Sequence, residues 1–462
     1  MKTQCLERPA EILVTHRRRP EGPQIRHASL HDADVAADGL APRFGSRRVH
    51  RDAGAAAIAA VVNAVVGAAF WAFAARFIPP QELGVMTAVL AVIVAVASVL
   101  ATGVGDAYTA LLPAVGRARP HIYRRGQHIF FGLVAAAAGI GAVGTVTLLE
   151  EVRGSVAVGL LVAAGIVAVA TFNLQMSTMM SIGRARWAPA ANIALGLGKI
   201  VLLPLLALVL SWHSVELAVV LTTAALAMIL RPIIKRIIVT GDGLPGTATI
   251  SPTRAPAEFN RVVVRTAGLS ALGLGVITLT PFLVTMFASP RQGALFALVF
   301  SIVSTFDFIA ASMAVSLVVH ASSAPRETAA MARGVLIRAG LLTTVGVAAL
   351  IVAMPVALRV LNPEYGRMNA LGVVALLCTA TITRVAYIVW AAVQQSRRDL
   401  HLPFSFNAVG AIVMLAAMPV LCESYGAVGG ALAVLIHQVF LTGAACVHVL
   451  ARLRSRRAQR HV

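Results

Sequence analysis

Long apolar runs alternate with short polar joints along most of the chain, from Gly54 to about residue 449. A helix that crosses the hydrocarbon core of a bilayer needs about 20 predominantly apolar residues. The runs therefore predict an all-α polytopic membrane protein with twelve transmembrane helices. The expected spans are approximately 54–77, 84–107, 128–149, 155–178, 188–211, 214–237, 265–288, 293–318, 334–358, 370–393, 402–421 and 426–449.

The first polar joint, residues 77–84 (Phe-Ile-Pro-Pro-Gln-Glu-Leu-Gly), has a counterpart later in the chain. Its two prolines cannot continue a helix, and we expect Gly84 to allow a sharp return of the chain. Residues 287–293 (Phe-Ala-Ser-Pro-Arg-Gln-Gly) also join two apolar runs. Phe287 and Pro290 follow Phe77 and Pro80 by 210 positions, and Gly293 follows Gly84 by 209.

A second pair of anchors repeats at nearly the same offset. Asn192 and Pro204 are 12 residues apart, as are Asn407 and Pro419, which follow them by 215 positions. Two anchors at nearly one offset predict an internal repeat of two related halves with six helices each.

The expected domain boundaries follow from this division and from linker composition. Residues 1–52 are expected to be a disordered basic cytoplasmic tail. The rest divides into an N-terminal lobe at 53–240, a cytoplasmic linker at 241–260, a C-terminal lobe at 261–450 and a basic cytoplasmic tail at 451–462.

Composition supports the membrane class and adds an orientation. The chain is 58% hydrophobic and only 13% charged, whereas soluble domains carry about 25% charged residues. The net charge is +20, and the basic residues lie mainly in alternate joints and in the tails. This pattern indicates membrane topology rather than nucleic-acid binding, because Lys and Arg stay cytoplasmic.

Both termini are therefore expected in the cytoplasm, with the protein in the cytoplasmic membrane. The same rule predicts a cytoplasmic position for Arg125, Arg186, Arg326 and Arg398, and an external one for Glu82, Glu151, Glu364 and Glu423.

Several enzyme classes find no support in the sequence. No Gly-rich phosphate loop precedes a Lys-Ser/Thr pair, His and Cys do not cluster at metal-binding spacing, and no large polar domain is present. The four cysteines are scattered without a disulfide pattern. We therefore expect a protein that is not an enzyme and that has no cofactor or metal.

Polar side chains inside apolar spans are costly, so each is a candidate functional residue. Lys199, Arg384 and Asp307 lie near the middle of the fifth, tenth and eighth spans, and Asn63 lies in the first. Lys199 and Arg384 could pair with Asp307 and hold the bundle together, or they could face a cavity and bind a ligand. Asn63 could bind substrate or form a hydrogen bond between helices.

Four short motifs resemble one family of membrane transporters. They lie at residues 76–84, at 183–186 with Asn192 and Lys199, at 361–366, and at 425–430. In this order they are similar to the O-antigen and teichoic-acid export proteins, the polysaccharide-flippase branch of the multidrug/oligosaccharidyl-lipid/polysaccharide (MOP) superfamily. The sequence departs from that family in having few intramembrane cations and a long basic N-terminal tail.

The resemblance implies two six-helix lobes around a central cavity that opens alternately to either face. It also implies a flippase that moves a polyprenyl-diphosphate-linked oligosaccharide across the cytoplasmic membrane by alternating access. It makes Lys199, Arg384 and Asn63 candidate substrate-binding residues and Asp307 a candidate ion-coupling or charge-pair residue. The implied partners are a lipid-linked glycan, membrane lipids and envelope polysaccharide assembly enzymes, with no nucleic acid. The alternative is a cation-coupled multidrug exporter of the same superfamily (MATE-like), in which Asp307 would bind the coupling ion and the organic cation.

Overall fold

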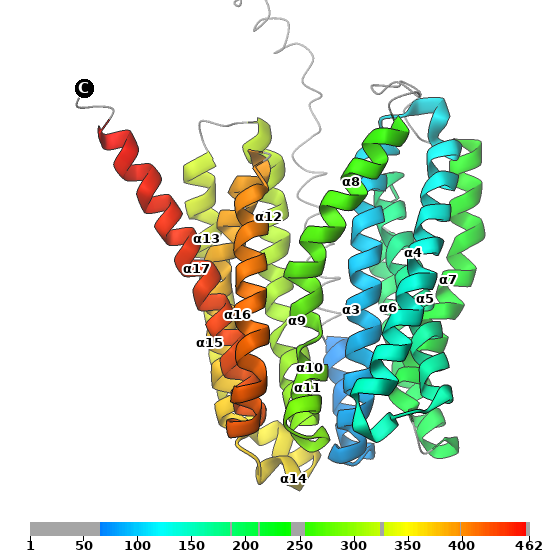
Figure 1. Ribbon diagram of the computed structural model, residues 1–462, viewed down its shortest axis with the longest axis vertical. Coiled ribbons are helices and arrows are strands. Elements are labelled where there is room, and N and C mark those ends of the chain that lie inside the picture. The colour runs from blue at the N-terminus through cyan, green and yellow to red at the C-terminus, as the bar shows by residue number, and fades with distance from the viewer. Residues whose placement is uncertain are drawn as a thin grey trace, which may run out of the picture. The chain divides into compact units, whose positions relative to one another are not determined.

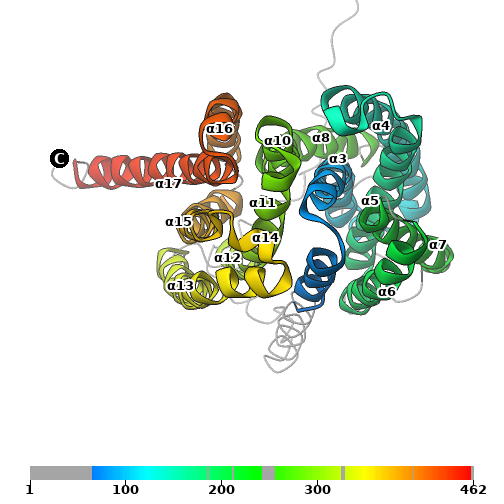
Figure 2. The ribbon, with the colours of Figure 1, turned by 90° about the horizontal axis from the view of Figure 1, so that it is seen from below.

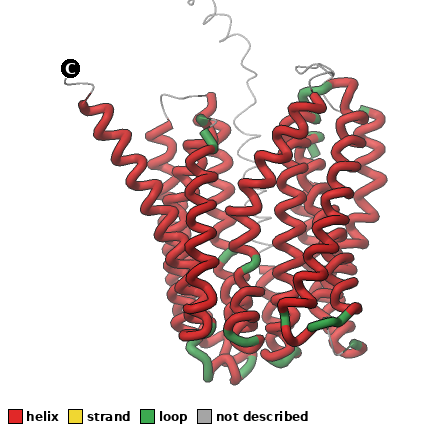
Figure 3. Tube along the Cα trace, viewed as in Figure 1, coloured by secondary structure: helices red, strands yellow, loops and turns green. Residues whose placement is uncertain are grey.

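The computed structural model describes residues 65–184, 187–210, 213–241, 255–323, 328–397 and 399–458. Every regular element in these ranges is a helix (Figure 3). Over the described residues, eleven helical spans are long and apolar enough to cross a membrane, and some of these spans contain more than one element. The expected all-α, multi-pass membrane class is therefore confirmed.

The main helices follow the expected order of spans (Figure 1). The first half contains a helix at Val65–Phe77, α3 (Pro80–Leu111), α4 (Arg119–Leu148), α5 (Val156–Ser181), α6 (Trp187–Val209) and α7 (Ser214–Thr240). The second half contains α8 (Ala255–Ser270), the π-helical turn η3 (Ala271–Gly275), α9 (Val276–Thr278), α10 (Thr280–Phe287), α11 (Pro290–Val303), α12 (Thr305–Ser323), α13 (Thr328–Leu361), α14 (Pro363–Gly366), α15 (Ala370–Ser396), α16 (His401–Tyr425) and α17 (Ala427–Ala458).

Some sequence expectations fall outside the described residues. These are the N-terminal tail, the first half of the first span with Asn63, most of the linker, and Arg186, Arg326 and Arg398. The count of twelve spans, the two-lobe repeat and the membrane orientation therefore stay predictions. Among the described elements, α14 lies at the opposite end of the bundle from the end of α17 (Figure 1). Glu364 in α14 and the arginines that end α17 are thus separated as the charge pattern predicts.

Helix α3 is the most enclosed of the long helices. In the most apolar 18-residue stretch of α3, 67% of the residues are buried. In the corresponding stretch of Pro189–Val209 in α6, only 6% are buried. It packs against α5 on one side and against α8, α10 and α11 on the other. Helices α12, α13, α15, α16 and α17 pack among themselves beyond α11, as Figure 2 shows in projection. The helix α3 therefore links the first and second halves of the chain.

The expected role of Gly84 was wrong. Gly84 is the fifth residue of α3 and does not form the turn, because α3 already begins at Pro80, where a missing N–H does no harm. A Cβ atom at Gly84 would overlap the carbonyl oxygen of Pro290, the first residue of α11. Gly84 is therefore required for the close approach of two backbones, and the two equivalent polar joints contact each other.

We expect the substitution Gly84→Ala to lower the free energy of unfolding by about 3 kcal/mol, since backbone overlap cannot be relieved by a rotamer change. Gly139→Ala in α4 is the matched control. The space around Gly139 is empty, so alanine there is expected to stabilise the helix by about 0.5–1 kcal/mol. Denaturant unfolding of both variants in detergent measures the difference. Equal stability of Gly84→Ala and the unmodified protein would contradict the close-packing account.

The seventh span begins earlier than the sequence indicated. Helix α8 starts at Ala255, within the expected linker, and ten residues before the expected start at 265. Hydropathy does not detect this first part, because it is amphipathic and extends beyond the apolar run. Its Phe259 and Val263 are buried, and the Phe259 ring lies 5.8 Å from the ring of Tyr108 in α3. Packing against α3 therefore extends the helix.

The seventh and eighth spans are both interrupted within the bundle. The seventh contains the π-helical turn η3 and a break at Leu279 between α9 and α10. The eighth has a turn at Ser304, between α11 and α12, where the backbone keeps helical angles and the Ser304 N–H still donates to the Phe300 carbonyl oxygen. π-Helical turns such as η3 occur often at functional sites. Asp307 lies three residues after Ser304.

Candidate functional site

A cavity of about 310 Å³ lies between the first helix, α3, α6, α7, α9, α10 and α11, and Lys199 lines it. On α6, the cavity is lined by Asn192, Leu195, Gly196 and Lys199. These residues are spaced at i, i+3, i+4 and i+7, so they share one face of the helix. Gly196 allows this face to approach Val66 of the first helix closely. The sequence of α6 thus places a cation and an amide in one cavity.

The remainder of this cavity is mostly apolar. Phe70, Trp71 and Phe300 contribute aromatic rings, and Thr87, Thr278 and Ser301 contribute hydroxyl groups. Among the described residues that line it, none is acidic and Lys199 is the one charged side chain. Lys199 is half-buried and has no acidic partner in the part of the chain that the structure describes. The cavity therefore presents an uncompensated positive charge in apolar surroundings.

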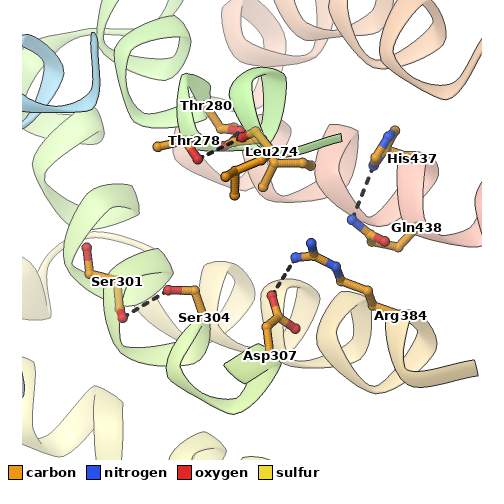
Figure 4. A network of polar contacts seen from close by, with 10 residues as sticks. Leu274, Thr278, Thr280, Ser301, Ser304, Asp307, Arg384, His437 and Gln438 are labelled. Carbon is orange, nitrogen blue, oxygen red and sulfur yellow. Dashed lines mark hydrogen bonds and ion pairs between the residues drawn. The ribbon is translucent and has the colours of Figure 1, made fainter. Parts of the chain in front are cut away.

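A second polar cluster lies in the C-terminal half of the bundle. Arg384 of α15 donates a hydrogen bond from Nη1 to Oδ2 of Asp307 in α12, and the two atoms are 2.6 Å apart (Figure 4). Their side chains are 25% and 18% exposed. This distance is typical of a strong charge-assisted hydrogen bond. The structure therefore brings two of the sequence candidates together as an ion pair.

The surroundings of the ion pair are also polar. A small cavity of about 20 Å³ contacts Asp307, Arg384, Thr381 and Gln438. Gln438 and its neighbour His437 are buried in α17, with Nε2 of the amide 3.2 Å from Nδ1 of the ring (Figure 4). Phe300 lines both this cavity and the one that contains Lys199. The two sites are therefore neighbours separated by one aromatic ring.

Arg384 explains how Asp307 is accommodated at this depth. The backbone N–H of Asp307 donates to the carbonyl oxygen of Ser304, at 3.1 Å, in the first turn of α12. The Ser304 N–H likewise donates to the carbonyl oxygen of Phe300, so the N–H groups of both residues are paired. The Arg384 guanidinium is therefore the group that compensates the Asp307 carboxylate.

The repeat-paired asparagines have different environments. Asn407 is 8% exposed and donates to the Tyr387 hydroxyl of α15 and, at 2.8 Å, to the carbonyl oxygen of Pro403. It also lies against Gly273 of η3, where a Cβ would come within 3.3 Å of its Oδ1. Asn407 therefore joins helices, whereas Asn192 faces the cavity. Asn63 lies outside the described residues.

Sequence reasoning missed most of the cavity wall. Thr87, Thr278 and Ser301 are single hydroxyl residues in apolar runs, and their positions carry no signal of a shared cavity. In the described part of the chain, no group of three or more His, Cys, Asp or Glu side chains is arranged to hold a metal ion.

Sequence comparison identifies no relative, since no family model and no curated protein match this chain. Structure comparison is informative. The lipid II flippase MurJ, in an inward closed conformation, has a TM-score of 0.62 at 10% identity, covering 85% of this chain and 87% of that one. A multidrug resistance MATE family transporter of the MOP superfamily, in an inward-facing conformation, has a TM-score of 0.58 at 14% identity, covering 86% and 95%.

A third similar structure is a MOP superfamily transporter from Pyrococcus furiosus, for which reverse polarity of the binding pocket suggests a different function. Its TM-score is 0.51 at 14% identity, with coverage of 87% of this chain and 95% of that one. At these identities the likeness concerns the fold. The chain therefore shares the fold of these transporters, as its family resemblance implies, while membership of the MOP superfamily and of its polysaccharide-flippase branch stays a prediction.

Proposed function

We propose that this chain is an alternating-access transporter that moves a polyprenyl-diphosphate-linked oligosaccharide across the cytoplasmic membrane. The observation that carries the proposal is the uncompensated charge of Lys199 in a cavity whose described lining residues include no acid. Keeping a cation in apolar surroundings is costly unless an anion visits it. The diphosphate of a lipid-linked sugar is such an anion.

The chemistry of the cavity fits the head of this substrate. The Lys199 ammonium supplies up to three N–H donors for charge-assisted hydrogen bonds to phosphate oxygens. Asn192, Thr278 and Ser301 supply neutral donors and acceptors suited to sugar hydroxyls. A volume of about 310 Å³ is at the lower end of the range for small-molecule sites, so it suits a headgroup rather than a whole glycan. The polyprenyl chain would stay in the bilayer.

Arg384 and Asn63 remain proposed contributors to substrate binding. Arg384 lies beside the Lys199 cavity, across Phe300, so a rearrangement of its pair with Asp307 would bring a second cation towards the ligand. Asn63 precedes the cavity residue Val66 by three positions in the sequence. The membrane lipids and envelope polysaccharide assembly enzymes are the further partners of this proposal, with both termini in the cytoplasm.

A second candidate function is export of organic cations coupled to a proton or sodium ion. One feature favours it, namely a carboxylate, Asp307, within a membrane-spanning segment beside a small polar cavity. Against it stands the ion pair, because Arg384 at 2.6 Å already neutralises that carboxylate. A transported cation would have to displace Arg384 from Asp307, or bind to Asp307 in a conformation in which this ion pair is broken.

Transport by the purified protein in vesicles separates the two functions. With a fluorescent lipid-linked diphospho-oligosaccharide in one assay and a fluorescent organic cation in the other, we expect movement of the first and none of the second. In a strain that depends on this protein, depletion should accumulate the lipid-linked oligosaccharide on the cytoplasmic leaflet. Ion-driven export of the organic cation, with no movement of the glycan lipid, would replace the flippase proposal with the second function.

A further inference from the structure

A separate cavity of about 550 Å³ lies between α13, α15 and α17, away from the Lys199 cavity. No described residue lines both cavities. Helix α15 packs against both α13 and α17, and Figure 2 shows it between them. The cavity therefore belongs to the C-terminal half alone and takes no part in the proposed transport site.

Positive charge gathers at one end of this cavity. Arg333 lies near the start of α13, Arg397 directly follows α15, and Arg452 lies near the end of α17. Arg452 has an acidic partner, Asp399, at 3.8 Å. In the part of the chain that the structure describes, Arg333 and Arg397 have no ion-pair partner and both are exposed. Two uncompensated guanidinium groups thus flank one end of the cavity.

The remainder of the cavity is mostly apolar. It is lined there by residues such as Leu336, Ala386, Val389 and Ala445. Ala386 precedes Arg397 by 11 residues, and at about 1.5 Å per residue this corresponds to roughly 16 Å along α15. One leaflet of the hydrocarbon core is about 15 Å thick, half of the whole. The apolar part therefore has the length of an acyl chain that hangs from the arginine end.

A buried polar group points to an occupant as well. Gln394, which lines the cavity, is 2% exposed, and its Oε1 has no hydrogen-bond partner among the described residues. A buried amide oxygen without a partner is destabilising, so it is expected to find a donor from a bound molecule. Gln394 lies three residues before Arg397, one turn inside the arginine end.

We propose that this cavity binds an anionic phospholipid of the cytoplasmic leaflet, with the phosphate between Arg333 and Arg397 and one acyl chain along α13, α15 and α17. Guanidinium groups hold a phosphate by paired hydrogen bonds. Basic pockets between membrane helices on the cytoplasmic side are suited to such headgroups. The Gln394 amide oxygen accepts a hydrogen bond from a headgroup hydroxyl. A bound lipid would join α13 to α17, which otherwise meet through α15.

Thermal unfolding of the delipidated full-length protein in a neutral detergent tests this site. We expect phosphatidylglycerol to raise the unfolding temperature by about 3–6 °C, by binding the folded state. Phosphatidylcholine with the same chains, and inorganic phosphate alone, should each produce less than a third of that shift. Equal shifts with the two lipids, or the full shift with phosphate alone, would show that the proposed headgroup and chain contacts are wrong.

Variants locate the binding. Arg333→Gln with Arg397→Gln should reduce the shift produced by phosphatidylglycerol at least threefold, and Ala386→Phe, which fills the apolar part without changing charge, should do the same. Arg454→Gln is the matched control, because Arg454 lies on α17 beside Arg452 but does not line the cavity. Melting without lipid shows whether each variant folds. An unchanged shift in both cavity variants, or an equal loss in the control, would overturn the proposal.

Discussion

Replacing Lys199 by alanine is expected to reduce glycan-lipid transport at least tenfold while the protein still folds and reaches the membrane. A hydrogen bond to a charged group contributes about 1.5–3 kcal/mol, and removing it at the phosphate corresponds to about a 10- to 100-fold loss of affinity. Folding should not suffer, because Lys199 has no acidic partner among the described residues that its removal would leave unpaired. The measurement is the rate of transport in vesicles at matched protein content.

Two variants serve as controls for this result. Lys199→Arg keeps a cation in the cavity and should retain part of the activity, although its geometry differs. Lys235→Ala makes the same chemical change at an exposed position of α7 outside the cavity and should transport normally. Normal transport by Lys199→Ala would rule out the cationic cavity as the binding site and would favour the cation exporter.

Replacing Arg384 by alanine is expected to lower the free energy of unfolding by about 3 kcal/mol. Removing one partner of a buried ion pair leaves the other charge uncompensated, which costs about 3–5 kcal/mol. The lower value applies because the side chains of Arg384 and Asp307 keep 25% and 18% of their exposure. Arg338→Ala, an exposed arginine of α13, is the matched control and should change stability by no more than about 0.5 kcal/mol.

A double-mutant cycle then assigns the role of Arg384. If Arg384 mainly pairs with Asp307, the combined replacement of both by alanine should recover most of the stability lost in each single variant. Denaturant unfolding in detergent gives the coupling free energy. Additive losses, together with lost transport in Arg384→Ala alone, would instead place Arg384 at the substrate. That outcome would support the prediction that both Lys199 and Arg384 bind the diphosphate.

The candidate site could be predicted in part from the sequence. Intramembrane charge singled out Lys199, Arg384 and Asp307, because a charged group in hydrocarbon is too costly to be incidental. The pairing was one of two open alternatives, since Asp307 and Arg384 are 77 residues apart. Repeat spacing suggested that Asn192 and Asn407 are equivalent, yet Asn407 hydrogen-bonds to Tyr387 and Asn192 faces the cavity. Matching positions in the sequence therefore do not give matching environments, because the neighbouring helices decide them.

The arginines at the cavity between α13, α15 and α17 also show how much depends on tertiary packing. In the sequence, basic residues beside the spans are topology signals, because their positions along the chain relate them only to the membrane surface. The packing of α13, α15 and α17 brings Arg333, Arg397 and Arg452 to one cavity. Similarly, Gly84 reads as a turn residue beside two prolines, and its contact with Pro290 exists only when α3 and α11 pack together.

The sequence by itself determined the all-helical membrane class and the approximate spans. Physically, a long apolar run in a bilayer must satisfy its own backbone hydrogen bonds, and a helix does so locally. Only the tertiary structure decided the lining of the Lys199 cavity, the Asp307–Arg384 pair and the turns at Leu279 and Ser304. These depend on which helix faces meet, and in lipid that is set by many small packing contacts between distant segments rather than by hydrophobicity.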